Sequence, residues 1–196
     1  MILCISKPVA TVLLFAVLGR MPADMFGYLM WSGVVLSLAA DITLLAEGNE
    51  SLVVGLGLSL VAYLCYGLAF FAAGPGGWLA ALPGLLAFGA CSAWFVRRQR
   101  GGIESGLRAP VWVHALVLAV MAGGVFSVLA GQALLDLAVL AALGATLLYL
   151  ARALLPWAHL RRLSVWAQAM ALVLYWGGQL ALVLSARWGI DVKVLQ

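Results

Sequence analysis

Long apolar runs alternate with short polar breaks along the whole chain, and this alternation predicts its elements. A helix needs about 20 mainly apolar residues to cross the roughly 30 Å hydrocarbon core of a bilayer. Runs of this kind occupy residues 2–19, 26–46, 52–73, 78–96, 110–131, 133–155 and 163–186. The turn between the fifth and sixth runs is inferred, because the apolar stretch from Pro110 to Leu155 is too long for one span. The pattern therefore predicts about seven transmembrane helices.

The composition supports an all-α, polytopic membrane helix bundle. Hydrophobic residues make up 66% of the 196 residues and charged residues 9%, whereas soluble globular chains have about 45–50% apolar and about 25% charged residues. The breaks leave no room for a soluble domain, so we expect residues 1–196 to form a single transmembrane domain. A cleaved signal peptide is disfavoured, because the residues before Lys7 are apolar and no small-residue cleavage site precedes Arg20.

Charge and residue usage argue against several function classes. The net charge of +4 comes mostly from arginines in two loops, which indicates membrane orientation and anionic lipid headgroups rather than nucleic acid. The three cysteines show no paired spacing, so disulfides and zinc are both disfavoured. With two histidines, no Gly-x-Ser-x-Gly elbow and no phosphate-binding loop, the sequence predicts no metal, no cofactor and no nucleotide chemistry.

The arginines also predict the orientation of the chain. The loops at 97–108 and 156–162 are separated by two predicted spans, so they lie on one side of the membrane. Loops rich in Lys and Arg stay in the cytoplasm. We therefore expect a cytoplasmic N-terminus and a C-terminus outside.

Few ionisable residues interrupt the apolar runs, and this topology brings them to one depth. An ionisable group in hydrocarbon is costly unless it is paired or hydrated, so by default it marks a functional interior. Lys7 and His114 lie early in spans that start in the cytoplasm, and Asp41 and Arg152 lie late in spans that end there. We expect Lys7, Asp41 and Arg152 to share one cavity.

Uncharged polar residues extend this layer toward the middle of the bilayer. Ser37 precedes Asp41 by four residues and shares its helical face, and Tyr63 and Tyr66 lie near the middle of the third span. On the last span, spacings of four, seven and four place on one face Ser164, Gln168, Tyr175 and Gln179. This stripe is expected to face the bundle interior.

Each of these residues also has a purely structural interpretation. Lys7, near a helix end, can extend its ammonium group to the headgroups. Asp41 can form a structural ion pair with Lys7 or Arg152, or stay protonated. His114, the tyrosines and the glutamines are often hydrogen-bonding groups between membrane helices.

Five short motifs follow one another along nearly the full chain: Lys7-Pro8, Ser37-Leu-Ala-Ala-Asp41, Val61-Ala-Tyr-Leu-Cys-Tyr-Gly-Leu-Ala-Phe70, Leu107-Arg-Ala-Pro-Val111 and Tyr175-Trp-Gly-Gly-Gln179. Their order resembles that of the YhhN family of multi-helix membrane proteins, whose characterised members are lysoplasmalogenases. Two segments differ from the family pattern. Tyr63 stands where the family usually has histidine, and Ala151-Arg152 where it has a Ser-Asp pair. Family members are also described with eight spans.

The resemblance implies an enzyme of the bacterial inner membrane that cleaves the alkenyl ether of a lysophospholipid to an aldehyde and a glycerophospho-alcohol. That reaction protonates an enol-ether carbon and adds water to an oxocarbenium-like cation, which suits two carboxyl groups in acid and base roles. Here only Asp41 remains as the acid/base.

In this interpretation Lys7 and Arg152 hold the substrate phosphate or tune Asp41, since a guanidinium matches phosphate oxygens. The remaining residues line the substrate pocket: Ser37, Tyr63, Tyr66, His114, Tyr175 and Gln179. The alternative is a non-enzymatic member that binds a lipid or amphiphile in the same cavity, as a carrier, sensor or partner subunit. The expected partners are thus a lipid or lysophospholipid and the bilayer itself.

Overall fold

A computed structural model describes residues 14, 16, 19, 24–44, 46, 48–73, 77–99, 108–131, 135–161 and 165–194. These residues form six α-helices and a short 3₁₀ helix: α2 (Met25–Thr43), α3 (Asn49–Ala73), α4 (Gly77–Gln99), α5 (Arg108–Ser127), η2 (Val128–Gly131), α6 (Leu135–Arg161) and α7 (Val165–Val194). No strand occurs in the described part of the chain, which is all-α as predicted. Most of the predicted span at 2–19, including Lys7, lies outside the described residues.

The helices correspond to the predicted spans from 26–46 onward. Five of them contain a stretch long and apolar enough to cross a membrane: Met25–Thr43, Val53–Ala73, Leu79–Arg98, Arg108–Ser127 and Ala169–Arg187. In α6 the apolar stretch is shorter, Leu137–Arg152. The inferred turn after residue 131 is confirmed, since η2 ends at Gly131 and α6 begins at Leu135. The protein is a membrane helix bundle, and the count of seven spans stays a prediction.

The end of α2 differs from the predicted span. We expected it at residue 46, but the helix ends at Thr43 and the amide of Leu44 caps it by bonding the Ala40 carbonyl at 2.9 Å. Gly48 then adopts a φ of 141°, which a side chain would oppose, and α3 starts directly after it. Apolar residues cannot reveal such a turn. As a consequence, Asp41 lies two residues from the end of α2.

The helices α6 and α7 are longer than their apolar runs. We predicted a break at Pro156, but α6 continues through it to Arg161, because the loss of one backbone donor does not have to end a membrane helix. The last span was predicted to end at residue 186, and α7 continues to Val194. Charged residues such as Arg187 end the apolar run without interrupting the backbone hydrogen bonds that form a helix.

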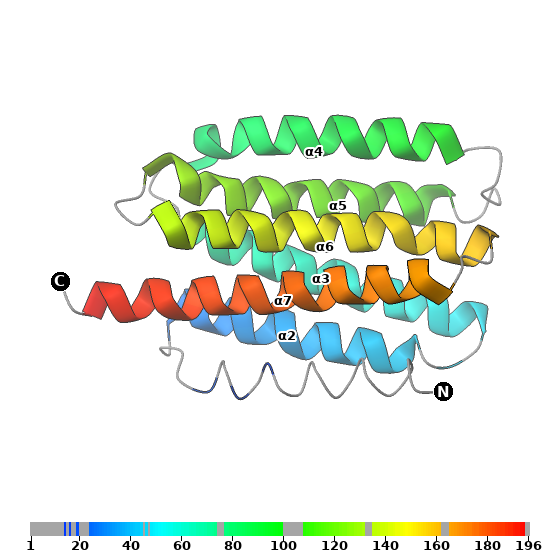
Figure 1. The fold of residues 1–196 in the computed structure, drawn as a ribbon, viewed down its shortest axis with the longest axis horizontal. Coiled ribbons are helices and arrows are strands. Elements are labelled where there is room, and N and C mark those ends of the chain that lie inside the picture. Colours follow the sequence, from blue (N-terminus) through cyan, green and yellow to red (C-terminus); the bar gives the residue numbers. More distant parts are fainter. Residues whose placement is uncertain are drawn as a thin grey trace.

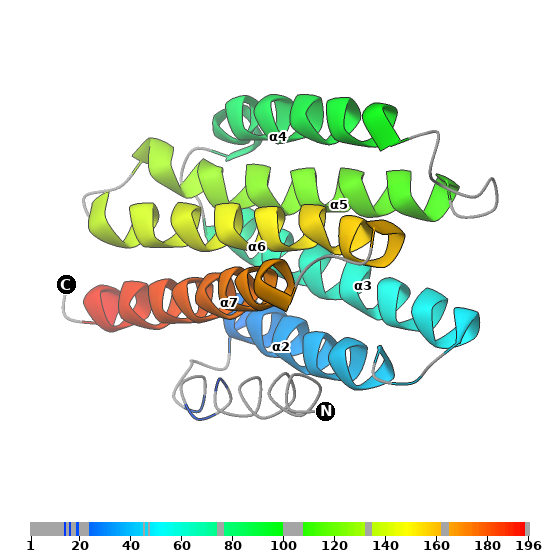
Figure 2. The ribbon, with the colours of Figure 1, turned by 45° about the vertical axis from the view of Figure 1, so that its right-hand side comes forward.

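Consecutive helices run antiparallel along one long axis (Figure 1). The helix α3 packs against α2 and α5, α5 also packs against α4 and α6, and α6 packs against α7. Figure 2 shows α4 at one edge and α2 and α7 toward the other. The antiparallel order brings the ends of α2, α4 and α6 to the end of the bundle at the right of Figure 1. That end carries the exposed side chains of Arg97, Arg98 and Arg108.

Glycines allow close contacts that shape the interior. A Cβ added to Gly178 on α7 would lie 2.8 Å from the carbonyl oxygen of Gly144 on α6. Membrane helices use small residues in this way because burying apolar surface gains little in lipid. On α2, Gly33 leaves room for the ring of Tyr66. These contacts hold α6 against α7 and α3 against α2, the helices that carry most of the site.

Large apolar side chains cover the outside of the bundle, and polar ones lie inside. Trp166 is 82% exposed, Val173 70% and Leu86 68%. The buried polar side chains are Ser37, Asp41, Ser59, Ser92, Ser127, Arg152, Gln179 and Ser185. This distribution suits lipid as the surrounding solvent, since polar groups at membrane depth must find partners within the protein.

Candidate functional site

Five polar side chains form a connected hydrogen-bond network between α2, α3 and α7. Tyr66 Oη donates to Gln179 Oε1 at 2.8 Å, and Gln179 Nε2 donates to Ser37 Oγ at 3.2 Å and to Tyr175 Oη at 3.4 Å. Tyr175 Oη in turn donates to Asp41 Oδ2 at 2.8 Å. All five side chains are buried, and buried polar groups need such partners. The network ends on the carboxylate of Asp41.

Asp41 is also paired with Arg152 from α6. The distance between Asp41 Oδ1 and Arg152 Nη2 is 3.7 Å, with Asp41 1% and Arg152 4% exposed. The contact is an ion pair rather than a hydrogen bond at this distance. Each charge offsets the other, which is the condition for burying either of them. This is one of the two pairings expected for Asp41.

Aromatic rings surround the guanidinium group of Arg152. Its Cζ lies 4.5 Å from the ring centroid of Tyr175 and 5.5 Å from that of Tyr63, positions in which a cation is attracted by the ring face. The Tyr63 ring meets the ring of His114 on α5 edge-on, with 5.9 Å between centroids. Through these contacts α5 joins α2, α3, α6 and α7 around one polar centre.

Helical periodicity explains why short stretches of sequence converge here. Three helices each contribute two residues three or four positions apart, which share one helical face: Ser37 with Asp41, Tyr63 with Tyr66, and Tyr175 with Gln179. All predicted site residues that the structure describes belong to this cluster or contact it. Lys7 lies outside the described residues, as do Ser164 and the side chain of Gln168 from the predicted stripe.

Comparison with known proteins identifies the family of the chain. The sequence matches the model of the YhhN family over residues 3–186. The chain belongs to the YhhN family. No curated protein and no solved structure gave a match. In this YhhN chain Tyr63 and Arg152, both named above among the differences from the family pattern, lie in contact.

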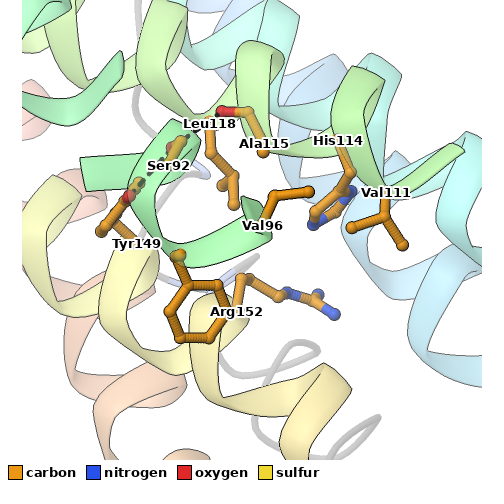
Figure 3. A pocket seen from close by; sticks show the side chains of 9 residues that line it. Ser92, Val96, Val111, His114, Ala115, Leu118, Tyr149 and Arg152 are labelled. Carbon is orange, nitrogen blue, oxygen red and sulfur yellow. Dashed lines mark hydrogen bonds between the residues drawn. The ribbon is translucent and has the colours of Figure 1, made fainter. Parts of the chain in front are cut away.

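The hydrogen-bonded side chains, together with Arg152 and Tyr63, are called here the Asp41 cluster: Ser37, Asp41, Tyr63, Tyr66, Arg152, Tyr175 and Gln179. This YhhN protein has a small pocket between α4, α5 and α6, next to that cluster (Figure 3). Its free space is about 30 Å³, which is about what two water molecules need. The pocket is lined by Ser92, Phe95, Val96, Val111, His114, Ala115, Leu118, Tyr149 and Arg152. Arg152 therefore belongs to both the Asp41 cluster and the pocket.

Two polar residues of this pocket were not among the site residues predicted from the sequence. Ser92 Oγ and Tyr149 Oη lie 2.8 Å apart, and each also reaches a backbone carbonyl, Ser92 that of Ala115 and Tyr149 that of Phe88, both at 3.3 Å. Tyr149 precedes Arg152 by three residues on α6, so helical spacing could have revealed it. Ser92 gives no such signal, since a single serine in an apolar helix usually bonds a neighbouring backbone group.

Asp41 is the central ionisable group of the site. No group of three His, Cys, Asp or Glu side chains within the described part of the YhhN chain could hold a metal ion. Asp41 is the only buried carboxylate of the described residues. It has a phenol and a guanidinium in contact, and both stabilise the ionised carboxylate.

Proposed function

We propose that the protein is a lysoplasmalogenase-like membrane hydrolase, which cleaves the alkenyl ether of a lysophospholipid to an aldehyde and a glycerophospho-alcohol. The observation that carries this proposal is the environment of Asp41, a carboxylate buried among apolar helices in contact with Arg152 and Tyr175. Such a group is costly at membrane depth and is retained for a function. Membership of the YhhN family supports the same reaction.

In the proposed reaction Asp41 transfers one proton. Asp41 rests as a carboxylate beside Arg152, so it first takes up a proton from solvent. It then gives this proton to the outer carbon of the alkenyl double bond, which leaves an oxocarbenium cation on the ether side. Arg152 and Tyr175 stabilise the carboxylate that forms, and the carboxylate stabilises the cation. Water adds to the cation and returns a proton to Asp41. The resulting hemiacetal breaks its bond to the glycerol oxygen and gives the aldehyde and the alcohol, so one water molecule is consumed.

The position of Asp41 along the bundle supports access from the cytoplasmic face. Asp41 lies near the end of α2, at the bundle end that carries Arg97, Arg98 and Arg108. Loops rich in arginine stay in the cytoplasm. We propose seven spans in a bacterial inner membrane, with the N-terminus in the cytoplasm and the C-terminus outside. Lys7 then lies at the depth of Asp41.

A second candidate function is the binding of a lipid or another amphiphile without catalysis, as a carrier, sensor or partner subunit. The observation that favours it is that Asp41 is the only buried carboxylate among the described residues, whereas comparable ether hydrolysis uses two. In this case Asp41 holds Arg152 in place and transfers no proton.

Aldehyde release from an alkenyl lysophospholipid tests the two candidates. The wild type is compared with Asp41→Asn, Tyr175→Phe and the control Glu50→Gln, which changes an exposed carboxylate in the first turn of α3. If Asp41 is the acid, Asp41→Asn lowers the rate by about 10²–10⁴-fold, Tyr175→Phe lowers it by about tenfold and Glu50→Gln leaves it unchanged. Arg152→Ala mainly weakens binding of the phosphate-bearing substrate.

The alternative predicts a different pattern in the same experiment. Wild-type protein then binds the lysophospholipid without releasing aldehyde, and Asp41→Asn retains this binding while Arg152→Ala loses it. Size-exclusion chromatography and circular dichroism of each variant establish that the protein is folded, because removal of Asp41 leaves the Arg152 charge buried.

A further inference from the structure

Arg152 has hydrogen-bonding capacity that the described protein does not use. The side chain is 4% exposed, yet its Nε and Nη2 atoms have no hydrogen-bond partner in the described part of the chain. The same holds for the buried Nδ1 atom of His114, on another wall of the same pocket. A buried polar group without a partner is destabilising, and more so if it is charged. Two such groups at one pocket point to a ligand with acceptor atoms.

Asp41 does not satisfy this capacity. Its ion pair with Arg152 spans 3.7 Å, which is too long for a hydrogen bond, and its other carboxylate oxygen accepts from Tyr175. The guanidinium of Arg152 also extends toward the side of the pocket where His114 lies (Figure 3). The ring of Tyr63 contacts both groups and holds them at this position.

The other end of the pocket does not attract an anion. Ser92 and Tyr149 have one hydroxyl hydrogen each, and three contacts compete for these two hydrogens: the one between the hydroxyls and those to the carbonyls of Ala115 and Phe88. Only lone pairs remain for a ligand at this end. An oxyanion in the pocket is therefore directed to Arg152 and His114.

We infer that the pocket between α4, α5 and α6 is an oxyanion subsite, which takes the phosphate group of the amphiphile. Arg152 donates from Nε and Nη2 to two phosphate oxygens, a geometry that a guanidinium matches, and His114 donates from Nδ1 in the tautomer that carries its hydrogen there. The free space of about 30 Å³, room for about two water molecules, suits one small oxyanion and excludes an acyl chain.

This subsite deepens the proposed function, on which its substrate class rests. The Nη2 atom that donates to the phosphate lies 3.7 Å from Asp41 Oδ1. A headgroup fixed in the pocket therefore holds the neighbouring ether close to Asp41, the kind of positioning that lowers the barrier of a proton transfer.

Binding of two matched, non-hydrolysable lipids tests the subsite without requiring turnover. The probes are a 1-alkyl glycerol phosphate and the 1-alkyl glycerol with the same chain and no phosphate, measured by tryptophan fluorescence in detergent micelles. We expect the wild type to bind the phosphate form at least tenfold more tightly. Ala115→Leu fills the pocket without removing a polar group, and it brings this ratio close to one. His114→Leu removes one donor and lowers the ratio about five- to tenfold.

Arg98→Ala is the matched control, because Arg98 is an exposed arginine stacked on Trp94 outside the pocket, and it leaves the ratio unchanged. Displacement of the bound alkyl phosphate by inorganic phosphate shows that free phosphate enters the same subsite, and absence of displacement assigns the subsite to the lipid headgroup. The inference is overturned if the wild type binds the two lipids equally well. It is also overturned if His114→Leu and folded Ala115→Leu both keep the wild-type ratio of the two affinities. Either result leaves only water in the pocket. Failure of aldehyde release with the ratio intact refutes the hydrolase proposal alone.

Discussion

The ion pair of Asp41 and Arg152 predicts that removing one partner destabilises the protein more than removing both. The perturbation is a double-mutant cycle of Asp41→Asn, Arg152→Met and the double variant. At the observed 3.7 Å and an effective dielectric constant of roughly 20, the attraction between the charges is about 4.5 kcal/mol. Loss of one partner of a buried pair costs about 3–5 kcal/mol, because an uncompensated charge stays buried. Replacing both removes that penalty.

The coupling between the two residues is therefore expected to reach at least about 3 kcal/mol. Equilibrium unfolding in detergent micelles titrated with sodium dodecyl sulfate, followed by tryptophan fluorescence, measures the four free energies of unfolding. The control cycle combines Glu50→Gln with Arg98→Met, both exposed, and its costs should add within about 0.5 kcal/mol. The reasoning would be refuted if the double variant lost as much stability as Asp41→Asn and Arg152→Met lose together. Such additivity would mean that neither charge depends on the other.

Three further predictions concern packing, the hydrogen-bond network and topology. Gly178→Ala should destabilise the protein by about 1–3 kcal/mol, because its new methyl group meets the Gly144 carbonyl oxygen at 2.8 Å. Gly177→Ala is the control: its methyl group meets only one side-chain carbon, at 3.7 Å, so it should be neutral in the same unfolding assay. Tyr66→Phe should cost about 1–3 kcal/mol, since it leaves the side-chain oxygen of Gln179 without its 2.8 Å donor; an unchanged stability would contradict the network. A C-terminal reporter that works only outside the cytoplasm should be active, and activity of a cytoplasmic reporter at that end would rule out the seven-span arrangement.

The depth of each residue in its span and its helical face can both be predicted from the sequence. Together they explain why most residues of the Asp41 cluster lie close to one another. Asp41 and Arg152 lie late in spans that share a side, so the topology alone brings them to one level. Spacings of four then place Ser37 beside Asp41 and Gln179 beside Tyr175. These rules work in a membrane because a polar group has few alternatives to the bundle interior.

The remaining features depend on how the helices pack, which one-dimensional spacing does not contain. The pairing of Ser92 with Tyr149 joins α4 to α6, helices that are far apart in the sequence. Arg152 Nη2 lacks a hydrogen bond because Asp41 Oδ1 lies 3.7 Å away rather than within hydrogen-bond distance. The end of α2 at Thr43 could not be predicted either, because the apolar run continues past it to residue 46.

The two departures from the family pattern act as one physical unit. Arg152 brings a positive charge into the interior, and a second cation beside it would be repelled, as a protonated histidine at position 63 would be. The tyrosine at that position instead offers the face of a neutral ring, 5.5 Å from the guanidinium carbon, which attracts a cation. Tyr63 thus makes Arg152 compatible with the site, and Arg152 in turn gives Asp41 a partner of opposite charge where the family pattern has a second carboxylate. We interpret the two differences from the family pattern as the replacement of a second carboxylate by a charge-balanced pair, and the inferred oxyanion subsite uses the Nε and Nη2 atoms of the same guanidinium.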